Sequence, residues 1–508
     1  MNNEVPFELK PLDEYNQALL QNVHPGDWQN PEPAEIYNLV VIGGGPAGLI
    51  TAAGAAGLGA KVALVERHLM GGDCLNVGCV PSKALIRPSR LAAEMRKATK
   101  FGLDSTEVTA DNFSEVMRRL RRIRAEISYY DSARRYRDEM GVDVFIGNAE
   151  FSGARTIGVG NRVLRFKKAV IATGAKAVHP HYPGLDETGY LTNETVFNLT
   201  ERPKHLIAVG GGPIGCELAQ AFRRLGAEVT IIQRRSLLPK EDPDASKLIT
   251  QIFEREGIRV MSNAKLLRAE KTATGKRLIV EIGGREQNVD GDEILIGAGR
   301  APNVAGLNLE VAGVEYDDRK GIIVNDNLRT TNPHIFAAGD VCMVWKFTHA
   351  ADAAARIVIQ NALFLGRAKL SSLNMPWCTY TDPEVAHVGM YKADAEHRGI
   401  ATDTYRVEMD AIDRAKIDGE TDGFIKVLVK KGTDRILGAT IVSAHAGEMI
   451  SEISVAMAAH VGLKTLSRVI HPYPTQAEAI KRIADAYSRT RLTPRVSAIV
   501  KWWLKRNI

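Results

Sequence analysis

The sequence predicts an α/β protein with two Rossmann-like dinucleotide-binding domains and a C-terminal α+β domain. An apolar strand, a G-x-G-x-x-G turn and a helical segment follow one another twice, first at Gly43 and again at Gly210. The chain has 508 residues, of which 45% are hydrophobic. It is therefore too long for a single hydrophobic core, and we expect several domains.

The first motif is the stretch YNLVVIGGGPAGLITAAGAAGLGAKVALVER, which reads as strand, glycine turn, helix and strand. Gly43 allows the tight turn, Gly45 lets the backbone approach a pyrophosphate, and Gly48 lets the helix pack on the strand. Glu66 ends the following strand, where an acid can bind ribose hydroxyls. The stretch therefore predicts a dinucleotide site.

The second motif, HLIAVGGGPIGCELAQAFRRLGAEVTIIQRRSLLP, has the same pattern, with Gly210, Gly212 and Gly215 in the three glycine positions. Its second strand ends at Gln233, so the acid typical of NAD sites is missing. Arg234 and Arg235 follow, where a 2′-phosphate would bind. The pattern favours NADPH over NADH, and two solvated arginines are the alternative.

Two dinucleotide folds suggest two dinucleotides that meet at their reactive ends, and we expect the first to bind FAD. The stretch TNPHIFAAGDVC resembles the second flavin motif of two-dinucleotide flavoproteins, whose aspartate binds the ribityl chain. A helix that starts near Thr348 would direct its positive end at the flavin. The residues assigned to this motif and to two further strand-to-loop crossings are Gly339, Asp340, Thr173, Gly174, Gly299 and Arg300.

Cys74 and Cys79 lie in GGDCLNVGCVPSK, and the chain has 5 cysteines in total. Sparse cysteines fit a reducing compartment, where a close pair is catalytic or metal-binding more often than structural. Five residues of a regular helix rise about 7.5 Å, whereas a disulfide tolerates about 7 Å between Cα atoms. The pair can form a disulfide only if the helix start is distorted, and Gly78 would help. The isolated cysteines are interpreted as packing residues: Cys216, Cys342 and Cys378.

Together these motifs resemble the pyridine nucleotide-disulfide oxidoreductases over about Tyr37 to Tyr487. The resemblance implies that C-x4-C is a redox-active disulfide that lies against the flavin ring. Cys74 would be the outer sulfur that exchanges with substrate, and Cys79 the inner sulfur that exchanges electrons with the flavin. Lys83 would pair with Glu217 near the flavin and nicotinamide, where a cation favours the thiolate.

The order of motifs also predicts the domain organisation. The stretches TYTDPEVAHVGM and GATIVSAHAGEMISEISVAMAAHVG resemble the interface domain of that family, which forms a homodimer and completes each active site from the other subunit. The expected segments are an N-terminal extension (1–36), the first part of the FAD-binding domain (37–191), the NAD(P)H-binding domain (192–299), the returning FAD-binding or central part (300–374), the dimerisation domain (375–487) and a basic amphipathic tail (488–508).

The family's C-terminal motif H-x-H-P-T-x-x-E reads HPYPTQAE here. Tyr473 takes the place of the catalytic histidine, and Glu478 takes that of the acid that orients it. A tyrosine with a pKa near about 10 is a poor base at neutral pH, although it can donate a hydrogen bond or steer a metal thiolate. This tyrosine and the stretch RRSLLPKEDP resemble mercuric reductases more than dihydrolipoamide dehydrogenases or glutathione reductases. The chain departs from mercuric reductases in having no vicinal cysteine pair in its last residues and no N-terminal C-x-x-C domain.

The function that this resemblance implies is a FAD-dependent NADPH oxidoreductase with a redox-active Cys74–Cys79 disulfide. Its acceptor would be a metal ion, a quinone-like electrophile or a disulfide, and the sequence does not choose among them. Two alternatives stay open. One is a disulfide reductase of the dihydrolipoamide dehydrogenase type, disfavoured by Tyr473 and Gln233, and the other is a membrane-docked redox sensor with slow turnover. We expect no resident metal.

The bulk composition limits the partners. A net charge of +6 is small for this length, and a phosphate-bearing ligand accounts for some of it, so nucleic acid is not expected. The basic stretch EVMRRLRRIRAEISYYDSARRYRD is interpreted as a solvated helix packed on the FAD domain. The N-terminus lacks the pattern of a secretory signal, and no apolar run is long enough to span a bilayer. A cytoplasmic location is expected.

The C-terminal tail predicts a basic amphipathic helix. One helical face carries Val496, Ile499, Val500, Trp503 and Leu504, and most of the rest is basic, with Arg495, Lys501, Lys505 and Arg506. A basic helix with tryptophans can lie on an anionic membrane surface. It can equally pack on the dimer or stay disordered.

Overall fold

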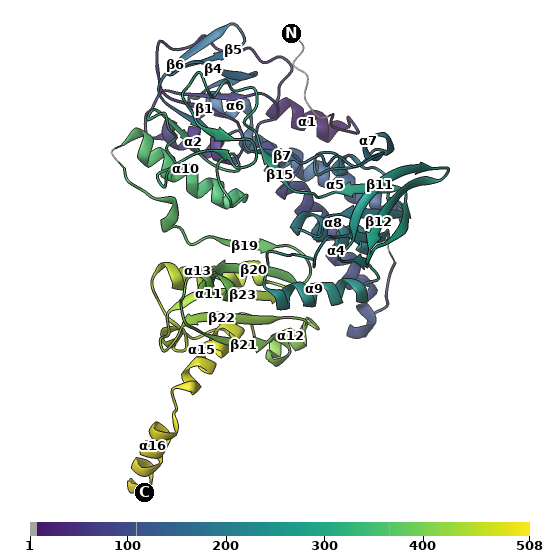
Figure 1. Ribbon diagram of the computed structural model, residues 1–508, viewed down its shortest axis with the longest axis vertical. Helices are drawn as coiled ribbons and strands as arrows, with labels where there is room; N and C mark the ends of the chain where they lie inside the picture. The colour runs from purple at the N-terminus through teal and green to yellow at the C-terminus, as the bar shows by residue number, and fades with distance from the viewer. Residues whose placement is uncertain (1–7, 108, 365, 508) are drawn as a thin grey trace. The chain divides into compact units, whose positions relative to one another are not determined.

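The computed structural model describes residues 8–107, 109–364 and 366–507, and these form two compact units. The first unit comprises residues 8–234 and 257–373, and the second comprises 235–256 and 374–507. Figure 1 shows both units as ribbons with their helices and strands labelled. The α/β class expected from the sequence is confirmed, and each Rossmann-like sheet lies in the first unit.

The larger sheet of the first unit contains both predicted strands of the first glycine motif. Its buried centre is parallel, because β1 pairs with both β2 and β6 in parallel, and β18 also pairs with β6 in parallel. The strands are, in spatial order, β3 (Asp143–Ile146), β2 (Val62–Glu66), β1 (Tyr37–Ile42), β6 (Arg162–Ile171), β5 (Thr156–Val159) and β4 (Ala149–Gly153), with β18 (Ile335–Ala337) paired to β6. Its helices α2 (Pro46–Gly57) and α10 (Thr348–Leu363) pack closely, since a Cβ on Gly54 would lie 2.6 Å from Ile359 Cδ1.

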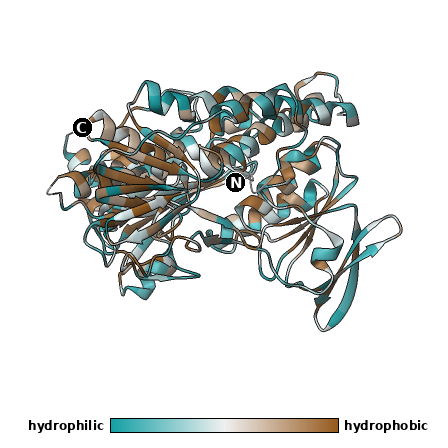
Figure 2. Cartoon of the chain, turned by 90° about the horizontal axis from the view of Figure 1, so that it is seen from above, coloured by the Kyte–Doolittle hydropathy of each residue, from teal (hydrophilic) through white to brown (hydrophobic). Residues whose placement is uncertain are grey.

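The second glycine motif forms a smaller parallel sheet in the same unit. The strands are β10 (Arg259–Met261), β9 (Glu228–Ile232), β8 (His205–Val209) and β14 (Glu293–Ile296), and α8 (Pro213–Arg224) connects β8 to β9. An antiparallel sheet follows in the chain, made of β11 (Lys265–Thr272), β12 (Gly275–Ile282) and β13 (Arg285–Gly291). Figure 2 shows hydrophobic residues concentrated in many of the strands, and β8 and β9 of the parallel sheet read HLIAV and EVTII, as a parallel sheet covered by helices requires.

The two glycine turns have the same geometry. Gly43 has φ +108° and Gly210 has φ +114°, a region that side chains other than glycine rarely adopt. A Cβ on Gly48 would lie 1.8 Å from the Gly43 carbonyl oxygen, and one on Gly215 would lie 1.9 Å from that of Gly210. The turn and the helix that follows can therefore meet only if both positions are glycine.

The second unit is built on a five-stranded antiparallel sheet. Its strands are β19 (Pro376–Thr379), β20 (Glu384–Gly389), β23 (Ile436–Ser443), β22 (Phe424–Lys430) and β21 (Thr402–Glu408). Helix α13 (Ala446–Ala458) packs on β20 and β23, and α15 (Glu478–Thr490) packs on β21 and β22. The last helix, α16 (Pro494–Arg506), has no buried residue.

One helix of the predicted NAD(P)H-binding segment (192–299) groups with the second unit. α9 (Pro243–Arg255) lies in residues 235–256. The segment before it is anchored there because Glu241 accepts hydrogen bonds from Trp377 Nε1 at 2.9 Å and from the Tyr391 hydroxyl at 2.7 Å. The expected domain boundaries stay predictions.

The N-terminal extension and the basic helix pack on each other. α1 (Glu14–Val23) contacts α5 (Ala110–Ser128), which also packs on α4 (Cys79–Arg96). The basic stretch was expected to be a solvated helix on the FAD domain. It does pack there, but Arg121 and Arg124 are buried, because carbonyl and carboxylate groups of neighbouring elements bind them.

Candidate active site

Cys74 and Cys79 lie on either side of a break between two helices. Cys74 is in α3 (Gly72–Asn76), and Cys79 is the first residue of α4. A Cβ on Gly78 would lie 2.7 Å from the carbonyl oxygen of Asp73, so only glycine fits between them. The helix start is therefore distorted in the way that the spacing of the pair required.

A single hydroxyl group contacts both thiols. The Thr348 Oγ1 lies 3.1 Å from the Cys74 Sγ and 3.4 Å from the Cys79 Sγ. Thr348 is the first residue of α10, so the positive end of that helix faces the sulfur pair. The sequence placed the start of this helix correctly, but it contained no signal for the contact with the thiols.

The two thiols differ in acidity. The hydrogen bond from Cys74, followed by that from Thr348 and the charge of Lys83, lowers the pKa of Cys79 to about 6. The pKa of Cys74 is raised, because the Cys74 thiol donates a hydrogen bond to Cys79 and is buried. Cys79 is therefore the thiolate of the reduced pair near neutral pH, and Cys74 retains the proton. Cys79 is also the more exposed of the two in this chain, so exposure alone does not identify the outer sulfur.

The predicted partners Lys83 and Glu217 meet. Lys83 Nζ lies 2.8 Å from Glu217 Oε2, and the Glu217 side chain is only 7% exposed. Lys83 is on α4, four residues after Cys79, and Glu217 is on α8. The helix that begins at the thiolate is thus linked to the helix of the second glycine turn.

The glycine turns fit dinucleotides. A Cβ on Gly45 would meet no atom closer than the Gly72 Cα at 3.8 Å, and one on Gly212 would meet nothing within 4 Å. Both residues have ordinary extended backbone angles. The chain's own packing therefore does not demand glycine there, whereas the close approach of a pyrophosphate does.

Glu66 lies at the end of β2, beside the first turn. Its Oε2 accepts from the Gly44 N–H at 2.5 Å and its Oε1 accepts from the His68 N–H at 2.7 Å. Burial raises the pKa of this carboxyl, and the two backbone donors oppose that rise. The acid predicted for the ribose also braces the glycine turn.

The predicted strand-to-loop crossings lie together in the first unit. Thr173 Oγ1 donates to the carbonyl of Asn303 at 2.7 Å, and the Asn303 N–H donates to the carbonyl of Gly174 at 3.0 Å. β15 (Arg300–Pro302), which follows Gly299, pairs with β7 (Ala175–Ala177).

Arg300 joins this crossing to the second flavin motif. Its guanidinium pairs with Asp73 and lies 3.6 Å from an oxygen of Asp340, the residue after Gly339. Burial raises the pKa of Asp340, and the charge of Arg300 opposes that rise. The sequence did not indicate Asp73, because nothing in the pattern around the cysteines distinguishes it from a solvated acid.

Arg234 and Arg235 follow the end of β9 and are both exposed. The Arg234 Nη2 donates to the hydroxyl of Tyr182 at 2.7 Å. Two exposed guanidinium groups after the second strand of a Rossmann fold can bind a 2′-phosphate.

Tyr473 and Glu478 belong to the second unit. Tyr473 is 72% exposed, and its hydroxyl donates to Asp413 Oδ2 at 3.2 Å, which raises its pKa. Glu478 does not hydrogen-bond to Tyr473. Its Oε1 accepts from Arg482 at 2.9 Å, and its Oε2 is buried with no hydrogen-bond partner among the described residues.

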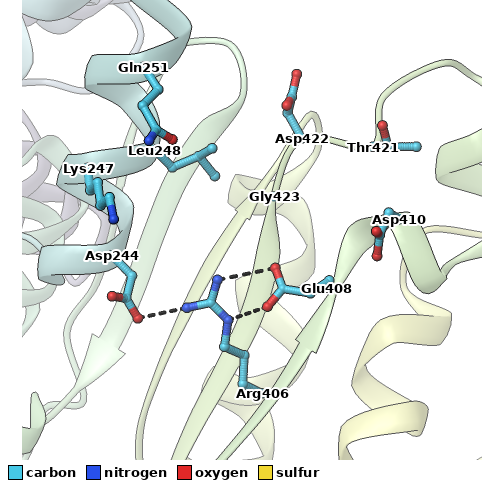
Figure 3. Close-up of a pocket in the computed structure, with 10 residues that line it drawn as sticks. All are labelled: Asp244, Lys247, Leu248, Gln251, Arg406, Glu408, Asp410, Thr421, Asp422 and Gly423. Atoms are coloured by element: carbon cyan, nitrogen blue, oxygen red, sulfur yellow. Dashed lines mark hydrogen bonds and ion pairs between the residues drawn. The ribbon is translucent and has the colours of Figure 1, made fainter.

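The second unit also contains a polar pocket of about 480 Å³ between α9 and the strand β21. Figure 3 shows Arg406 held between Asp244 and Glu408 in this pocket. None of the residues predicted for the active site is among the described residues that line it.

No described helix is both long and apolar enough to cross a membrane. Among the described side chains, no group of three or more histidines, cysteines or acids is arranged to hold a metal ion.

Comparison with known proteins shows the family of the chain. Residues 37–355 match the family described as pyridine nucleotide-disulphide oxidoreductase, and residues 375–484 match the dimerisation domain of that family. A mercuric reductase of Staphylococcus aureus is 34% identical over 502 residues, which cover 96% of this chain and 91% of that protein.

Solved structures give the same result. The Cu(II) complex of the HOCl-induced flavoprotein disulfide reductase RclA of Escherichia coli has a TM-score of 0.78 at 29% identity, and covers 88% of this chain and 99% of that one. LpdA of Mycobacterium tuberculosis has a TM-score of 0.80 at 26% identity, and covers 89% of this chain and 99% of that one.

Proposed function

The chain belongs to the pyridine nucleotide-disulphide oxidoreductase family, and from this we propose that it is a mercuric reductase-like flavoenzyme that uses NADPH to reduce a thiol-reactive acceptor through Cys74 and Cys79. One observation carries the proposal: the two sulfurs share the hydroxyl of Thr348, and the pKa of Cys79 is lowered to about 6. A thiol pair with one stable thiolate is suited to redox exchange.

The residues of the first unit have distinct roles in this proposal. Lys83 and Thr348 stabilise the Cys79 thiolate, while Cys74 holds the proton and meets the acceptor. In each turnover the Cys79 thiolate and the Cys74 thiol together lose two electrons and one proton and form one disulfide, and the acceptor takes the two electrons. Glu217 holds the ammonium group of Lys83 beside the thiolate.

FAD and NADPH are the cofactors proposed for the two glycine turns. A bound flavin would supply two-electron transfer between the nicotinamide and the sulfur pair. The residues proposed to hold FAD are Gly43, Gly45, Gly48, Glu66, Thr173, Gly174, Gly299, Arg300, Gly339 and Asp340, and those proposed for NADPH are Gly210, Gly212, Gly215, Arg234 and Arg235.

The proposed acceptor is a thiophilic metal ion. Such ions bind thiolates directly and need no proton from a side chain, which suits a chain with Tyr473 in place of a histidine. One similar protein is named a mercuric reductase, and one similar structure is a Cu(II) complex. A quinone-like electrophile is the second choice on the same argument, and a disulfide is the third.

A panel of acceptors tests this proposal. We expect NADPH oxidation by the purified flavoprotein to be faster with Hg(II) or Cu(II) than with lipoamide or glutathione disulfide. Cys74→Ser should abolish this turnover, whereas Cys378→Ser, an isolated cysteine of the second unit, should leave it unchanged. Fastest turnover with lipoamide would favour the dihydrolipoamide dehydrogenase alternative, and no turnover with any acceptor would favour the sensor.

A homodimer is proposed from the dimerisation domain. The second unit exposes large apolar side chains that a second subunit would cover, among them Ile470 at 92% and Tyr473 at 72%. In this arrangement Tyr473 of one subunit would complete the active site of the other. Sedimentation equilibrium should give twice the mass of the chain, and a monomer with full turnover would contradict the arrangement.

The tail is proposed to contact an anionic membrane surface from a cytoplasmic location. After Asp485 the chain has no acid, and its basic residues are Arg489, Arg491, Arg495, Lys501, Lys505 and Arg506. The apolar face of α16 is exposed. Co-sedimentation with phosphatidylglycerol vesicles, but not with phosphatidylcholine vesicles, is expected and should be lost when residues 494–508 are removed. A shortened chain that instead fails to dimerise would show that the tail packs on the dimer.

A further inference from the structure

The N-terminal segment, residues 8–36, lies outside the family match and packs on the loop before α3. The N–H of Met70 donates to the carbonyl oxygen of Val23 at 3.1 Å. The ring Nδ1 of His24 forms a hydrogen bond with the carbonyl of His68. Both contacts therefore join the end of α1 to the chain that enters α3.

A buried arginine links the same segment to the other end of α3. Arg124 of α5 is 0% exposed; its Nη1 donates to the Asn76 carbonyl at 2.7 Å and its Nη2 donates to Asn16 Oδ1 at 2.6 Å. Asn76 is the last residue of α3, and its Nδ2 donates to the carbonyls of Met70 and Gly72. The contacts thus run from α1 through Arg124 to both ends of α3.

These contacts matter because α3 has only 5 residues. A helix of one turn is not stable alone, so its position is set by what it contacts. Burial lowers the pKa of Arg124 to about 10, and its Nε has no hydrogen-bond partner among the described residues. A buried charge must be hydrogen-bonded, so loss of the Asn16 acceptor would release the guanidinium and, with it, the end of α3.

We propose that residues 8–24 brace α3 and thereby hold Cys74 within reach of Cys79, with Asn16 and Arg124 as positioning residues. The inference rests on the proposed function, in which these two cysteines exchange. A mobile α3 would leave both thiols chemically intact but would lower their effective concentration toward each other.

Equilibration with glutathione measures that effective concentration. Oxidised glutathione takes two electrons from the sulfur pair, one proton from the Cys74 thiol and one proton from solvent, which gives the Cys74–Cys79 disulfide and two reduced glutathiones. Loss of a hydrogen bond to a charged group changes an equilibrium constant by about tenfold or more. We expect Asn16→Ala in the full-length flavoprotein to lower the equilibrium constant for disulfide formation by at least about tenfold. The oxidised fraction is read by alkylation and mass spectrometry.

The chain offers a matched control on the same helix. Asn22 Nδ2 donates to Ser128 Oγ at 2.9 Å, and no hydrogen bond joins Asn22 to α3 among the described residues, so Asn22→Ala should leave the equilibrium constant unchanged. Asn16→Asp keeps an acceptor opposite Arg124, so its equilibrium constant for disulfide formation should match that of the unmodified protein. Amide hydrogen exchange of residues 70–78 should accelerate in Asn16→Ala only.

The outcomes separate the brace from the proposed function. If the unmodified protein forms no reversible Cys74–Cys79 disulfide, both fail. If it does, and Asn16→Ala shifts the equilibrium no more than Asn22→Ala, the brace alone is overturned. If Asn16→Ala does not fold, Asn16→Asp and the amide hydrogen exchange of residues 70–78 in the unmodified protein still test the brace. Slow exchange throughout α1 together with fast exchange in α3 would contradict it.

Discussion

The ammonium nitrogen of Lys83 lies 2.8 Å from Oε2 of Glu217, on a helix that comes from the second glycine turn. The residues are 134 positions apart in the chain. The charge of Lys83 also contributes to the lowered pKa of Cys79, and the charge of Glu217 opposes that effect. The pair therefore couples α8 to the acidity of the Cys79 thiol.

Lys83→Met should raise the pKa of Cys79 above its value of about 6, because the variant removes the cation that favours the thiolate. In the unmodified reduced protein the thiolate is present above about pH 6 and is lost as the pH falls through that value. The variant should lose it at higher pH. The ultraviolet thiolate absorbance, followed as a function of pH, measures the midpoint. Lys97→Met, an exposed change at the far end of α4, should not move it.

Thr348→Val should raise the pKa of Cys79 as well, because valine cannot donate to the sulfur. Thr348→Ser keeps the hydroxyl and should behave like the unmodified protein. The rate of alkylation by iodoacetamide at pH 7, located by mass spectrometry, should fall at Cys79 in the valine variant only. Equal rates in the two variants would show that the hydroxyl does not tune the thiol.

NADPH should be preferred over NADH by more than about tenfold in kcat/KM, because each charge-assisted contact with a 2′-phosphate contributes about 1.5–3 kcal/mol. Replacing Arg234 and Arg235 with glutamine should abolish the preference, because it weakens the binding of NADPH. The control is Arg223→Gln on α8, a residue whose guanidinium binds the carbonyl of Ala227. Equal kcat/KM for the two cofactors in the unmodified protein contradicts the assignment.

Tyr473→His should raise activity with lipoamide or glutathione disulfide by at least about tenfold, since general acid–base catalysis contributes about 10²–10⁴ in rate. Glu478 offers its buried Oε2, and Asp413 already accepts from the side chain at this position, so carboxylates are available to orient the ring. Reduction of metal ions should not change. Tyr473→Phe is the matched control and should show no gain with either disulfide. Brisk lipoamide turnover by the unmodified enzyme would mean that another base is at work.

Much of the first unit could be predicted because its requirements are local. Gly43 and Gly210 need positive φ, and Gly48 and Gly215 leave no room for a Cβ. These requirements apply to residues only a few positions apart, so they produce a recognisable motif in the sequence. The distorted helix at Cys79 was predictable for the same reason, since the spacing of the pair and the neighbouring glycine are both local.

The contacts that set the chemistry of the sulfurs could not be predicted in this way. Thr348 lies 274 positions from Cys74, and Asn16 lies 108 positions from Arg124. The sequence determined the glycine turns, the cysteine pair and the order of the motifs along the chain, because each depends on residues that are close in sequence. Only the tertiary structure decided which thiol keeps the proton, that the N-terminal segment packs against α3, and that Glu478 pairs with Arg482 rather than with Tyr473. Hydrogen bonds between distant segments impose no period and no spacing on a sequence, so their partners become visible only when the chain is folded.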